Sequence, residues 1–453
     1  MKMVIDRAAV ATVDDDGSEY SPGYVIIDGH RIADVGPGAA PRPAEPHTYL
    51  DASGCLISPG FVNTHHHLFQ WATRGFAQNA TLFEWLTALY PVWSRLDAEI
   101  TAAAATAGLS RLALTGCTTA ADHHYLFPAD GGDHITALAG SAGRVGLRLH
   151  AVRGAMDRGQ SKGGLPPDSM VEDTEKALTG MRDAVTAHHD PRPESLVRIG
   201  LGPCAPFSVS RELMTRSAVL ARELGVRLHT HLAETTDEEE RCLAEFGCTP
   251  VQYAEQLGWL GGDVWLAHAV HLDLGSVKRL AATATGVAHC PTSNGRLGAG
   301  IAPVRDLLAA GVPVGLGVDG SASNESAGLI EELRQALLIA RLQDGPAALD
   351  VRQSLWMATM GGARCLGRDN ELGSLERGKL ADIAVWRLDG LAHAGIGDAV
   401  AALVLGPAPE LKLLTVNGEP VVTDGQLSRV DIEEVAREHR IACRRLLAAD
   451  PPR

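Results

Sequence analysis

Eight short apolar runs of β character alternate with longer helical runs through the central part of the chain. The β-like runs cover residues 55–65, 117–124, 147–154, 197–204, 226–234, 264–270, 286–294 and 312–320. Strands that alternate with helices pair in parallel, because a crossover helix returns the chain to the same edge of the sheet. Eight such units match the repeat number of a closed (β/α)8 barrel, so we predict an α/β fold of this TIM-like type. An open doubly wound sheet is the alternative that counting alone leaves open.

The two ends of the chain have a different character. "GYVIIDGHRIADVG" near the start and "LKLLTVNGEPVVTDGQL" near the end combine apolar β runs with Asp-Gly and Asn-Gly turns. Neither end is large enough to fold alone, so we expect the two to pair into one small β domain. The predicted division is residues 1–55 and 369–428 for the small domain, 56–368 for the barrel and 429–453 for a C-terminal helix.

Charge and cysteine usage narrow the choice of partners and compartment. The formal net charge is −15, which argues against nucleic acid, because such binding relies on Lys and Arg neutralising phosphates. We expect a small-molecule substrate instead. The sequence has neither an apolar run long enough for a membrane span nor a secretory signal. Its eight scattered cysteines form no C-x-x-C pair, which is typical of a reducing compartment, and we predict a cytoplasmic protein.

Polar side chains gather where the apolar runs end. In a barrel of this type the active site lies at the carboxyl ends of the strands, so metal-capable residues are expected there. The runs end in the following histidines and carboxylates: His65, His67, His123, His124, His229, His231, Glu234, His268 and Asp319. Each of these taken alone also fits a buried structural role, and Asp319 could cap the helix that follows it. Their joint placement favours an active site.

The stretch "NTHHHLFQ" indicates which histidines act together. Side chains of an extended segment alternate between faces, so His65 and His67 share one face and His66 points the other way. With His231 and Asp319 they would offer nitrogen and oxygen ligands from three strand ends. Such a set suits one divalent ion with an open position, with Zn²⁺ first and Fe²⁺ or Mn²⁺ admissible.

Two further polar residues stand close to these ligands in the sequence pattern. Glu234 follows His231 by three residues and is predicted to move protons without binding the ion. His268 is predicted to orient the attacking water or to polarise the intermediate. A bound divalent ion lowers the pKa of water to about 7, so hydrolysis at neutral pH becomes feasible.

At this point the chain shows a resemblance to a known family. "PGFVNTHHH", "HTHLAE", "LAHAVH" and "GLGVDGSASN" resemble the amidohydrolase superfamily, in its cytosine/guanine deaminase-like branch. The resemblance implies a (β/α)8 barrel with a small β-sandwich, one divalent metal and hydrolytic removal of an amino group from an aromatic ring. It carries the ligand roles to His65, His67, His231 and Asp319, and the proton-transfer roles to Glu234 and His268. The absence of lysine from "VRIGLGPCAPFSV" favours a single metal over the binuclear arrangement.

Closer motifs narrow the expected activity. "GCTTAADHHYLFP", "LGPCAPFSV", "HLAETTDEE" and "HCPTSN" look most like bacterial 8-oxoguanine deaminases. We therefore expect an aminohydrolase that acts on C–N bonds other than peptide bonds, in cyclic amidines. The expected substrate is 8-oxoguanine, with isocytosine or guanine-like rings also admissible, and ammonia as product. The alternatives are a hydroxyatrazine-type s-triazine (alkyl)aminohydrolase and a cyclic-amide hydrolase of the same fold. We expect a homo-oligomer.

The substrate pocket is predicted only in outline. Gln70 offers an amide donor and acceptor for the edge of a lactam-bearing heterocycle. Three aromatic residues are candidates for stacking on a flat ring, namely Trp85, Tyr125 and Phe207, although Trp85 fits helix core packing equally well. Cys204 could line the pocket, but no partner that would activate its thiol is evident.

Overall fold

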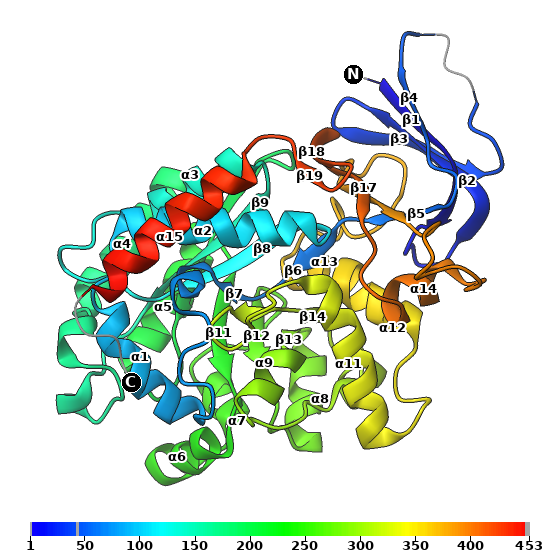
Figure 1. Ribbon diagram of the computed structural model, residues 1–453. Coiled ribbons are helices and arrows are strands. Elements are labelled where there is room, and N and C mark those ends of the chain that lie inside the picture. The colour runs from blue at the N-terminus through cyan, green and yellow to red at the C-terminus, as the bar shows by residue number, and fades with distance from the viewer. Residues whose placement is uncertain (1, 42–44, 449–453) are drawn as a thin grey trace.

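The fold of the computed structural model, which describes residues 2–41 and 45–448, is built around eight parallel strands that form a barrel (Figure 1). Neighbouring strands follow chain order, so each pair is joined by a crossover, as the alternation of strands and helices predicts. The α/β barrel prediction is confirmed. The barrel strands are β6 (Phe61–Asn63), β8 (Cys117–His124), β9 (Arg148–Ala155), β10 (Val197–Pro203), β11 (Leu228–Leu232), β12 (Val264–His268), β13 (Gly286–His289) and β14 (Val314–Leu316).

The first and last barrel strands meet through a few specific hydrogen bonds. The backbone N–H of Thr64 donates to the carbonyl of Leu316 at 2.9 Å, and the N–H of Val318 donates to Oδ1 of Asn63 at 3.0 Å. Just beyond them, β7 (His66–His67) pairs in parallel with β15 (Asp319–Gly320). This nearly complete closure brings the histidines that follow the first strand beside Asp319. About 250 residues separate them in the sequence, which is roughly the length of a whole barrel of this type.

Helices cover the barrel strands, and several of them begin at a side-chain cap. The side chains of Asp97, Asp133, Ser210 and Asp273 each accept a hydrogen bond from the backbone N–H three residues on, which satisfies one unpaired donor of the first turn. The helices are α1 (Leu82–Trp93), α2 (Ala98–Leu114), α3 (His134–Val145), α4 (Thr174–His188), α5 (Arg211–Leu224), α6 (Thr236–Phe246), α7 (Pro250–Gln256), α8 (Leu274–Thr283), α9 (Pro291–Arg296), α10 (Val304–Ala309), α11 (Leu329–Asp344), α12 (Val351–Trp356), α13 (Gly362–Cys365), α14 (Ala399–Leu405) and α15 (Ile432–Leu447). Shorter 3₁₀ or π turns are η1 (Leu68–Thr73), η2 (Gln160–Lys162), η3 (Asp168–Met170) and η4 (Met357–Gly361).

Both ends of the chain join in a separate sheet, as predicted. Figure 1 shows its blue and orange strands together at one end of the molecule. The N-terminal and C-terminal parts meet where β5 pairs antiparallel with β16 and parallel with β1. Ile5, Val25, Ile57, Ile383 and Val385 from both parts share one buried apolar cluster. The strands are β1 (Lys2–Ala11), β2 (Glu19–Asp28), β3 (Arg31–Pro37), β4 (Thr48–Asp51), β5 (Cys55–Pro59), β16 (Ile383–Arg387), β17 (Leu411–Val416), β18 (Glu419–Thr423) and β19 (Gln426–Leu427).

The first predicted run, residues 55–65, is divided between the two sheets. β5 belongs to the terminal sheet, whereas β6 belongs to the barrel. Gly60 lies between them, and its N–H donates to the carbonyl of Asp382 at 2.9 Å. A side chain at Gly60 would place a Cβ 2.2 Å from Thr118, so the close crossing requires glycine. The division of the chain into domains at fixed residues stays a prediction.

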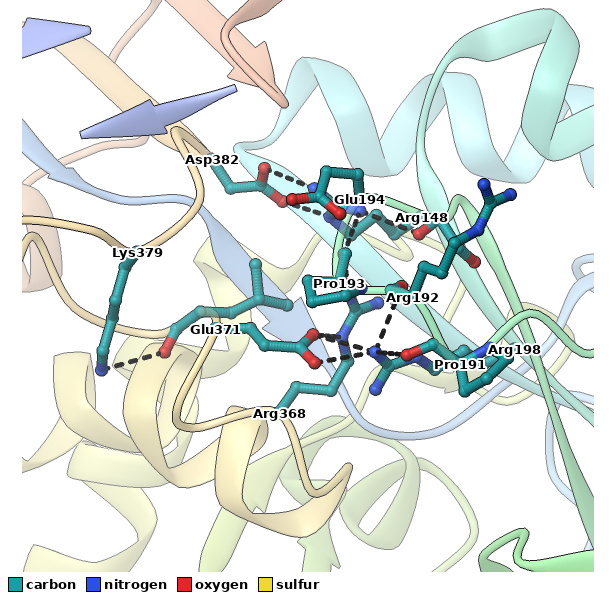
Figure 2. A network of polar contacts seen from close by, with 12 residues as sticks. Arg148, Pro191, Arg192, Pro193, Glu194, Arg198, Arg368, Glu371, Lys379 and Asp382 are labelled. Atoms are coloured by element: carbon teal, nitrogen blue, oxygen red, sulfur yellow. Dashed lines mark hydrogen bonds and ion pairs between the residues drawn. The ribbon is translucent and has the colours of Figure 1, made fainter. Parts of the chain in front are cut away.

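A buried polar network joins the barrel to the terminal sheet (Figure 2). Arg148, at the start of β9, donates from Nε and a terminal nitrogen to both oxygens of Asp382, at 2.7 and 3.0 Å. Its guanidinium is fully buried. Arg198 and Arg368 both donate to the Glu371 carboxylate, at distances of 2.8 to 3.1 Å. These charges are paired and hydrogen-bonded, which is the condition under which burial of ions is tolerated.

The predicted C-terminal helix is α15, which packs on α2 beside the barrel (Figure 1). Residues 449–453 at the end of that predicted segment lie outside the described residues. None of the helices in the described part of the chain combines the length and apolar character that a membrane crossing requires.

Candidate metal centre and active site

Side chains from four strand ends converge at the carboxyl end of the barrel. Nε2 of His65 and Nε2 of His67 lie 3.2 and 3.3 Å from Oδ1 of Asp319. Nε2 of His67 is also 3.0 Å from Nε2 of His231. Ligand-capable atoms of His65, His231, His268 and Asp319 all lie within 4.8 Å of one another. The structure therefore brings the predicted ligands and His268 into one cluster.

The hydrogen bonds of His67 and His231 show that this cluster fits a cation. Nδ1 of His67 contacts the carbonyl of His123 at 2.7 Å, and Nδ1 of His231 contacts the carbonyl of Cys204 at 2.7 Å. A carbonyl only accepts, so each Nδ1 carries the proton and each Nε2 presents a lone pair. Burial lowers the pKa of both histidines well below the usual value, so both are neutral. Two lone pairs 3.0 Å apart repel unless a positive ion lies between or beside them.

Asp319 completes the donor set with a carboxylate that stays ionised. Its Oδ2 accepts hydrogen bonds from the hydroxyls of Ser293 and Ser323, at 2.5 and 3.2 Å. Burial opposes ionisation, but the contact with His65 and the charge of His268 hold the pKa of Asp319 well below its usual range. Oδ1 is thus left as an anionic oxygen beside the imidazoles of His65 and His67. Three nitrogens and one oxygen form a set suited to Zn²⁺ and related divalent ions.

Glu234 and His268 form a second pair next to the cluster. Oε2 of Glu234 lies 3.7 Å from Nε2 of His268, and both side chains are buried. Burial raises the pKa of Glu234 to about 7, so its carboxyl can hold or release a proton near neutral pH. Burial opposes protonation of His268, yet the charges of Glu234 and Asp319 and a contact with Asn294 raise its pKa. Nδ1 of His268 lies 3.0 Å from the amide oxygen of Asn294.

The backbone at these strand ends adopts left-handed conformations that side-chain-bearing residues rarely occupy. Ala233, His268 and Asp319 have φ angles of 55°, 72° and 60°. Such conformations cost on the order of 1–3 kcal/mol each and persist only where the surroundings impose them. At Ala233 that support is visible, because the buried Glu238 carboxylate accepts the N–H groups of Ala233 and Glu234 at 2.9 and 3.0 Å. Strained residues of this kind concentrate at functional sites.

A pocket opens beside the cluster, with about 380 Å³ of empty space. All five predicted pocket residues line it, namely Gln70, Trp85, Tyr125, Cys204 and Phe207. Burial raises the pKa of the Cys204 thiol to about 12, so this group is a neutral wall rather than a nucleophile. Within the described part of the chain, Oε1 of Gln70 has no hydrogen-bond partner.

Sequence reasoning missed one wall of this pocket. Leu82, Leu86 and Tyr90 of α1 also line it, together with Leu297. The buried hydroxyl of Tyr90 has no partner among the described residues. The signal was present in the helical spacing, because residues 82, 86 and 90 stand four apart and Trp85 completes the same face.

Sequence analysis assigns no role to three histidines of the strand ends, His123, His124 and His229, and two of them, His123 and His229, lie in the candidate metal clusters. Ligand-capable atoms of His65, His123 and His229 lie within 4.8 Å of one another, as do those of His67, His123 and His231. His229 shares the period-two spacing of His231, so its inward direction was predictable from β11. The hydrogen-bond partners of His229 were not predictable, because they depend on how the barrel closes.

A parallel (β/α) barrel with histidines and an aspartate gathered at the carboxyl ends of its strands defines the class of metal-dependent barrel hydrolases. The comparisons agree with this class. The chain belongs to the amidohydrolase family, whose sequence profile matches residues 56–426.

Relatives of known activity include deaminases. The chain is 43% identical to the 8-oxoguanine deaminase of Pseudomonas aeruginosa over 98% of both chains. It is 38% identical to an isoxanthopterin deaminase from an unknown prokaryotic organism, over 96% of this chain and 94% of the relative. The chain is therefore a hydrolase acting on C–N bonds, and a hydrolytic deaminase of the amidohydrolase family.

A solved structure extends the likeness to three dimensions. The fold superposes with a TM-score of 0.93 on a mutant of the atrazine chlorohydrolase of Arthrobacter aurescens TC1 complexed with zinc and atraton. The two chains are 34% identical, and the match covers 97% of this chain and all of the other. That protein holds zinc, which agrees with a metal-binding role for the histidine and aspartate cluster described above.

Proposed function

We propose that this protein removes the exocyclic amino group of 8-oxoguanine by hydrolysis and releases ammonia, with one Zn²⁺ at the candidate metal centre. The observation that carries the proposal is the convergence of Glu234, His268 and Asp319 on a pocket that also holds the amide oxygen of Gln70, which has no hydrogen-bond partner among the described residues. Similarity to the deaminase from Pseudomonas aeruginosa over the whole chain supports the choice of substrate.

The substrates named for two relatives share one of their two fused rings. 8-Oxoguanine and isoxanthopterin both contain a 2-amino-pyrimidin-4-one ring fused to a second ring that carries a carbonyl group. The amino-bearing carbon of such a ring is the electrophile of a hydrolytic deamination. The pocket combines apolar and aromatic side chains with polar groups of the candidate metal centre, which suits a flat ring with a polar edge.

The proposed ligands of the ion are His65, His67, His231 and Asp319. When bound, the ion supplies Lewis acidity that makes water nucleophilic near pH 7. The chain holds these ligands ready, because backbone carbonyls fix the tautomers of His67 and His231, and two serine hydroxyls hold Asp319. Iron(II) and manganese(II) remain admissible for the same donors.

The proton steps are assigned to three residues of this chain. Asp319, ionised at neutral pH, accepts a proton from the attacking water. Glu234, with its pKa near 7, donates a proton to a ring nitrogen and later passes one to the departing amine. His268 lies beside Glu234 and stabilises the negative charge that develops on the substrate. The oxygen of the water becomes a new ring carbonyl as the C–N bond breaks and ammonia leaves. The proton that Glu234 passes to the amine comes from the hydroxyl group of the addition intermediate, and the proton held by Asp319 returns to Glu234.

Substrate recognition is assigned to the pocket wall. The amide of Gln70 faces the lactam edge of the ring, where it can both donate and accept. The hydroxyl of Tyr90, which lacks a partner among the described residues, is available to the same ring. Tyr125, Phe207 and Trp85 supply flat or apolar contact area.

An ammonia-release screen on zinc-loaded protein tests the proposal. The panel contains 8-oxoguanine, isoxanthopterin, guanine, isocytosine and hydroxyatrazine. We expect the highest kcat/KM with 8-oxoguanine and ammonia in a one-to-one ratio with the deaminated ring. Release of ethylamine from hydroxyatrazine without ammonia from any purine would replace the proposal with a triazine aminohydrolase, and activity on none would favour cyclic-amide hydrolysis.

The proposal includes a cytoplasmic homo-oligomer. All eight cysteines are free thiols, and Cys443 alone among them is more than slightly exposed, which suits a reducing compartment. Light scattering of the purified protein and fractionation of the native cells are the direct tests.

A further inference from the structure

A chain of two imidazoles connects the candidate metal centre to the backbone of β12. Nδ1 of His229 contacts the carbonyl oxygen of Trp265 at 2.8 Å. Nε2 of His229 lies 2.8 Å from Nδ1 of His65. Nε2 of His65 is the atom that faces Asp319 at 3.2 Å. All three side chains are buried, so solvent does not supply alternative partners.

The carbonyl oxygen of Trp265 determines which nitrogens of His229 and His65 are donors and which are acceptors. A carbonyl oxygen only accepts, so Nδ1 of His229 carries the proton. A neutral imidazole has one donor and one acceptor nitrogen, which makes Nε2 of His229 an acceptor. The proton between the two rings therefore belongs to Nδ1 of His65. His65 is then left with a lone pair on Nε2, directed at the candidate metal centre.

His65 differs in this respect from the other two proposed histidine ligands. His67 and His231 each donate from Nδ1 to a backbone carbonyl, which no substitution of a side chain removes. The equivalent acceptor for His65 is another side chain. A metal-binding histidine depends on such an outer partner for its tautomer and ring orientation, and loss of the partner typically costs about 10–100-fold in metal affinity.

We propose that His229 is a positioning residue, which holds His65 in the tautomer whose Nε2 lone pair faces the metal centre. The inference rests on the proposed function for the ligand role of His65. His229 is the first histidine of "HTHLAE". To position His65, it must accept a hydrogen bond at Nε2 and donate one from Nδ1. The ring also stacks on Trp265, with centroids 4.4 Å apart, which fixes its orientation.

Three substitutions separate this task from mere packing. His229→Phe keeps an aromatic ring against Trp265 but removes the acceptor. His229→Gln places an amide oxygen near the former Nε2 position, whereas His229→Asn is too short to reach His65. His150→Phe is the matched control, because His150 is also buried against Trp265, with centroids 5.3 Å apart, but belongs to none of the candidate metal clusters.

The first measurement is the tautomer of His65 in metal-free protein labelled with ¹⁵N-histidine. Long-range ¹H–¹⁵N spectra distinguish the two tautomers, and the His65 signals are identified by their absence from His65→Gln. We expect the Nδ1–H form in the wild type, His229→Gln and His150→Phe. We expect the Nε2–H form or a mixture in His229→Phe and His229→Asn. If His229→Phe fails to fold, the comparison of the Gln and Asn variants decides the question.

The second measurement is zinc affinity by competition with a chelator. His229→Phe and His229→Asn should bind zinc about 10–100-fold more weakly than the wild type. His229→Gln should stay within about threefold, and His150→Phe should not differ from the wild type. An unchanged His65 tautomer and unchanged zinc affinity in folded His229→Phe would overturn the inference. A wild type that binds no zinc would instead overturn the proposed function, and the tautomer spectra would still decide the role of His229.

Discussion

At the scale of single residues, the account depends most on Glu234. It is buried beside His268, and burial raises its pKa to about 7 although the charge of His268 opposes this shift. A group with that pKa is matched to proton transfer at neutral pH. Asp319, equally buried, stays ionised because histidines and hydroxyls surround it. The two environments thus favour opposite protonation states, so Glu234 can act as the proton donor and Asp319 as the proton acceptor.

Glu234→Gln should lower kcat by about 10²–10⁴-fold, because an amide of similar shape cannot transfer the proton. Zinc content, measured on the purified variant by elemental analysis, should stay at the wild-type level. Glu240→Gln, at an exposed position of α6 close by, is the control and should leave both values unchanged. Loss of zinc from the Glu234 variant would make that residue a ligand and refute its assigned role.

Gly320→Ala should weaken substrate binding without unfolding the protein. A Cβ at this position would lie 1.8 Å from Oε1 of Gln70, so the flexible Gln70 side chain must move away from its present place. We expect a KM for 8-oxoguanine raised about tenfold, equivalent to about 1.4 kcal/mol, from the loss of one hydrogen-bonding group. Gly295→Ala, where an added Cβ meets nothing within 4 Å, is the control. An unaltered KM would mean that Gln70 does not contact the substrate.

The predictability of the site differs from residue to residue. The common direction of His65 and His67 follows from period-two geometry and needs no knowledge of the fold. The role of His229 depends on its partners, Trp265 of β12 and His65 in the segment between β6 and β7, which barrel closure brings together. Tyr90 was missed because a helical stripe of apolar and aromatic residues predicts core and pocket wall alike.

At the scale of elements, β8 and η1 are tied together by a buried carboxyl. Oδ1 of Asp122 accepts the backbone N–H of Leu68 at 2.6 Å, and its Oδ2 has no partner among the described residues. Burial raises the pKa of Asp122 to about 7. The hydrogen bond to Leu68 supports the turn that follows the histidine cluster, so the carboxyl acts through the placement of η1.

Asp122→Asn should stabilise the protein increasingly as pH rises from about 4 to 7. Because the folded-state pKa is raised above the unfolded value of about 3.9, the folded state holds a proton that it must lose as pH rises through 7. Wild-type stability therefore falls over this window, whereas the amide is insensitive. Between pH 5 and pH 8 the advantage of the variant in urea unfolding should grow by about 2–3 kcal/mol. A difference that is constant with pH would contradict the raised pKa.

The buried ion pair of Arg148 and Asp382, which joins the barrel to the terminal sheet, leads to a separate prediction. Arg148→Met should destabilise the protein by about 3–5 kcal/mol, because it leaves the Asp382 carboxylate buried without its charge partner. Arg305→Met is the control, since Arg305 pairs with Asp306 on an exposed surface and should cost less than about 1 kcal/mol. Equal losses in chemical denaturation would show that the buried pair is not a structural joint.

The run at residues 55–65 shows where element prediction from sequence reached its limit. Its continuous apolar residues predict one strand, yet the segment enters two different sheets. Continuous burial produces the same pattern in either sheet. The separation at Gly60 depends on the approach of Thr118 from the neighbouring strand, which no local pattern contains.

At the scale of the whole molecule, the alternation of strands and helices was sufficient to predict the barrel. Each of the eight predicted runs overlaps a barrel strand, because parallel strands joined by crossover helices have few ways to close. The terminal sheet followed from the reasoning that neither end could bury its apolar residues alone. The order of strands in that sheet was not predictable, since pairing between residues far apart leaves no periodic signal.

The central claim is that one divalent ion is held jointly by His65, His67, His231 and Asp319. Diffraction from crystals of the zinc-loaded protein, recorded on both sides of the zinc absorption edge, tests it most directly. The account predicts one anomalous peak per chain, at about 2.0–2.2 Å from Nε2 of the three histidines and from an oxygen of Asp319. A peak ligated instead by His123 and His229, or no peak in the barrel at all, would contradict it.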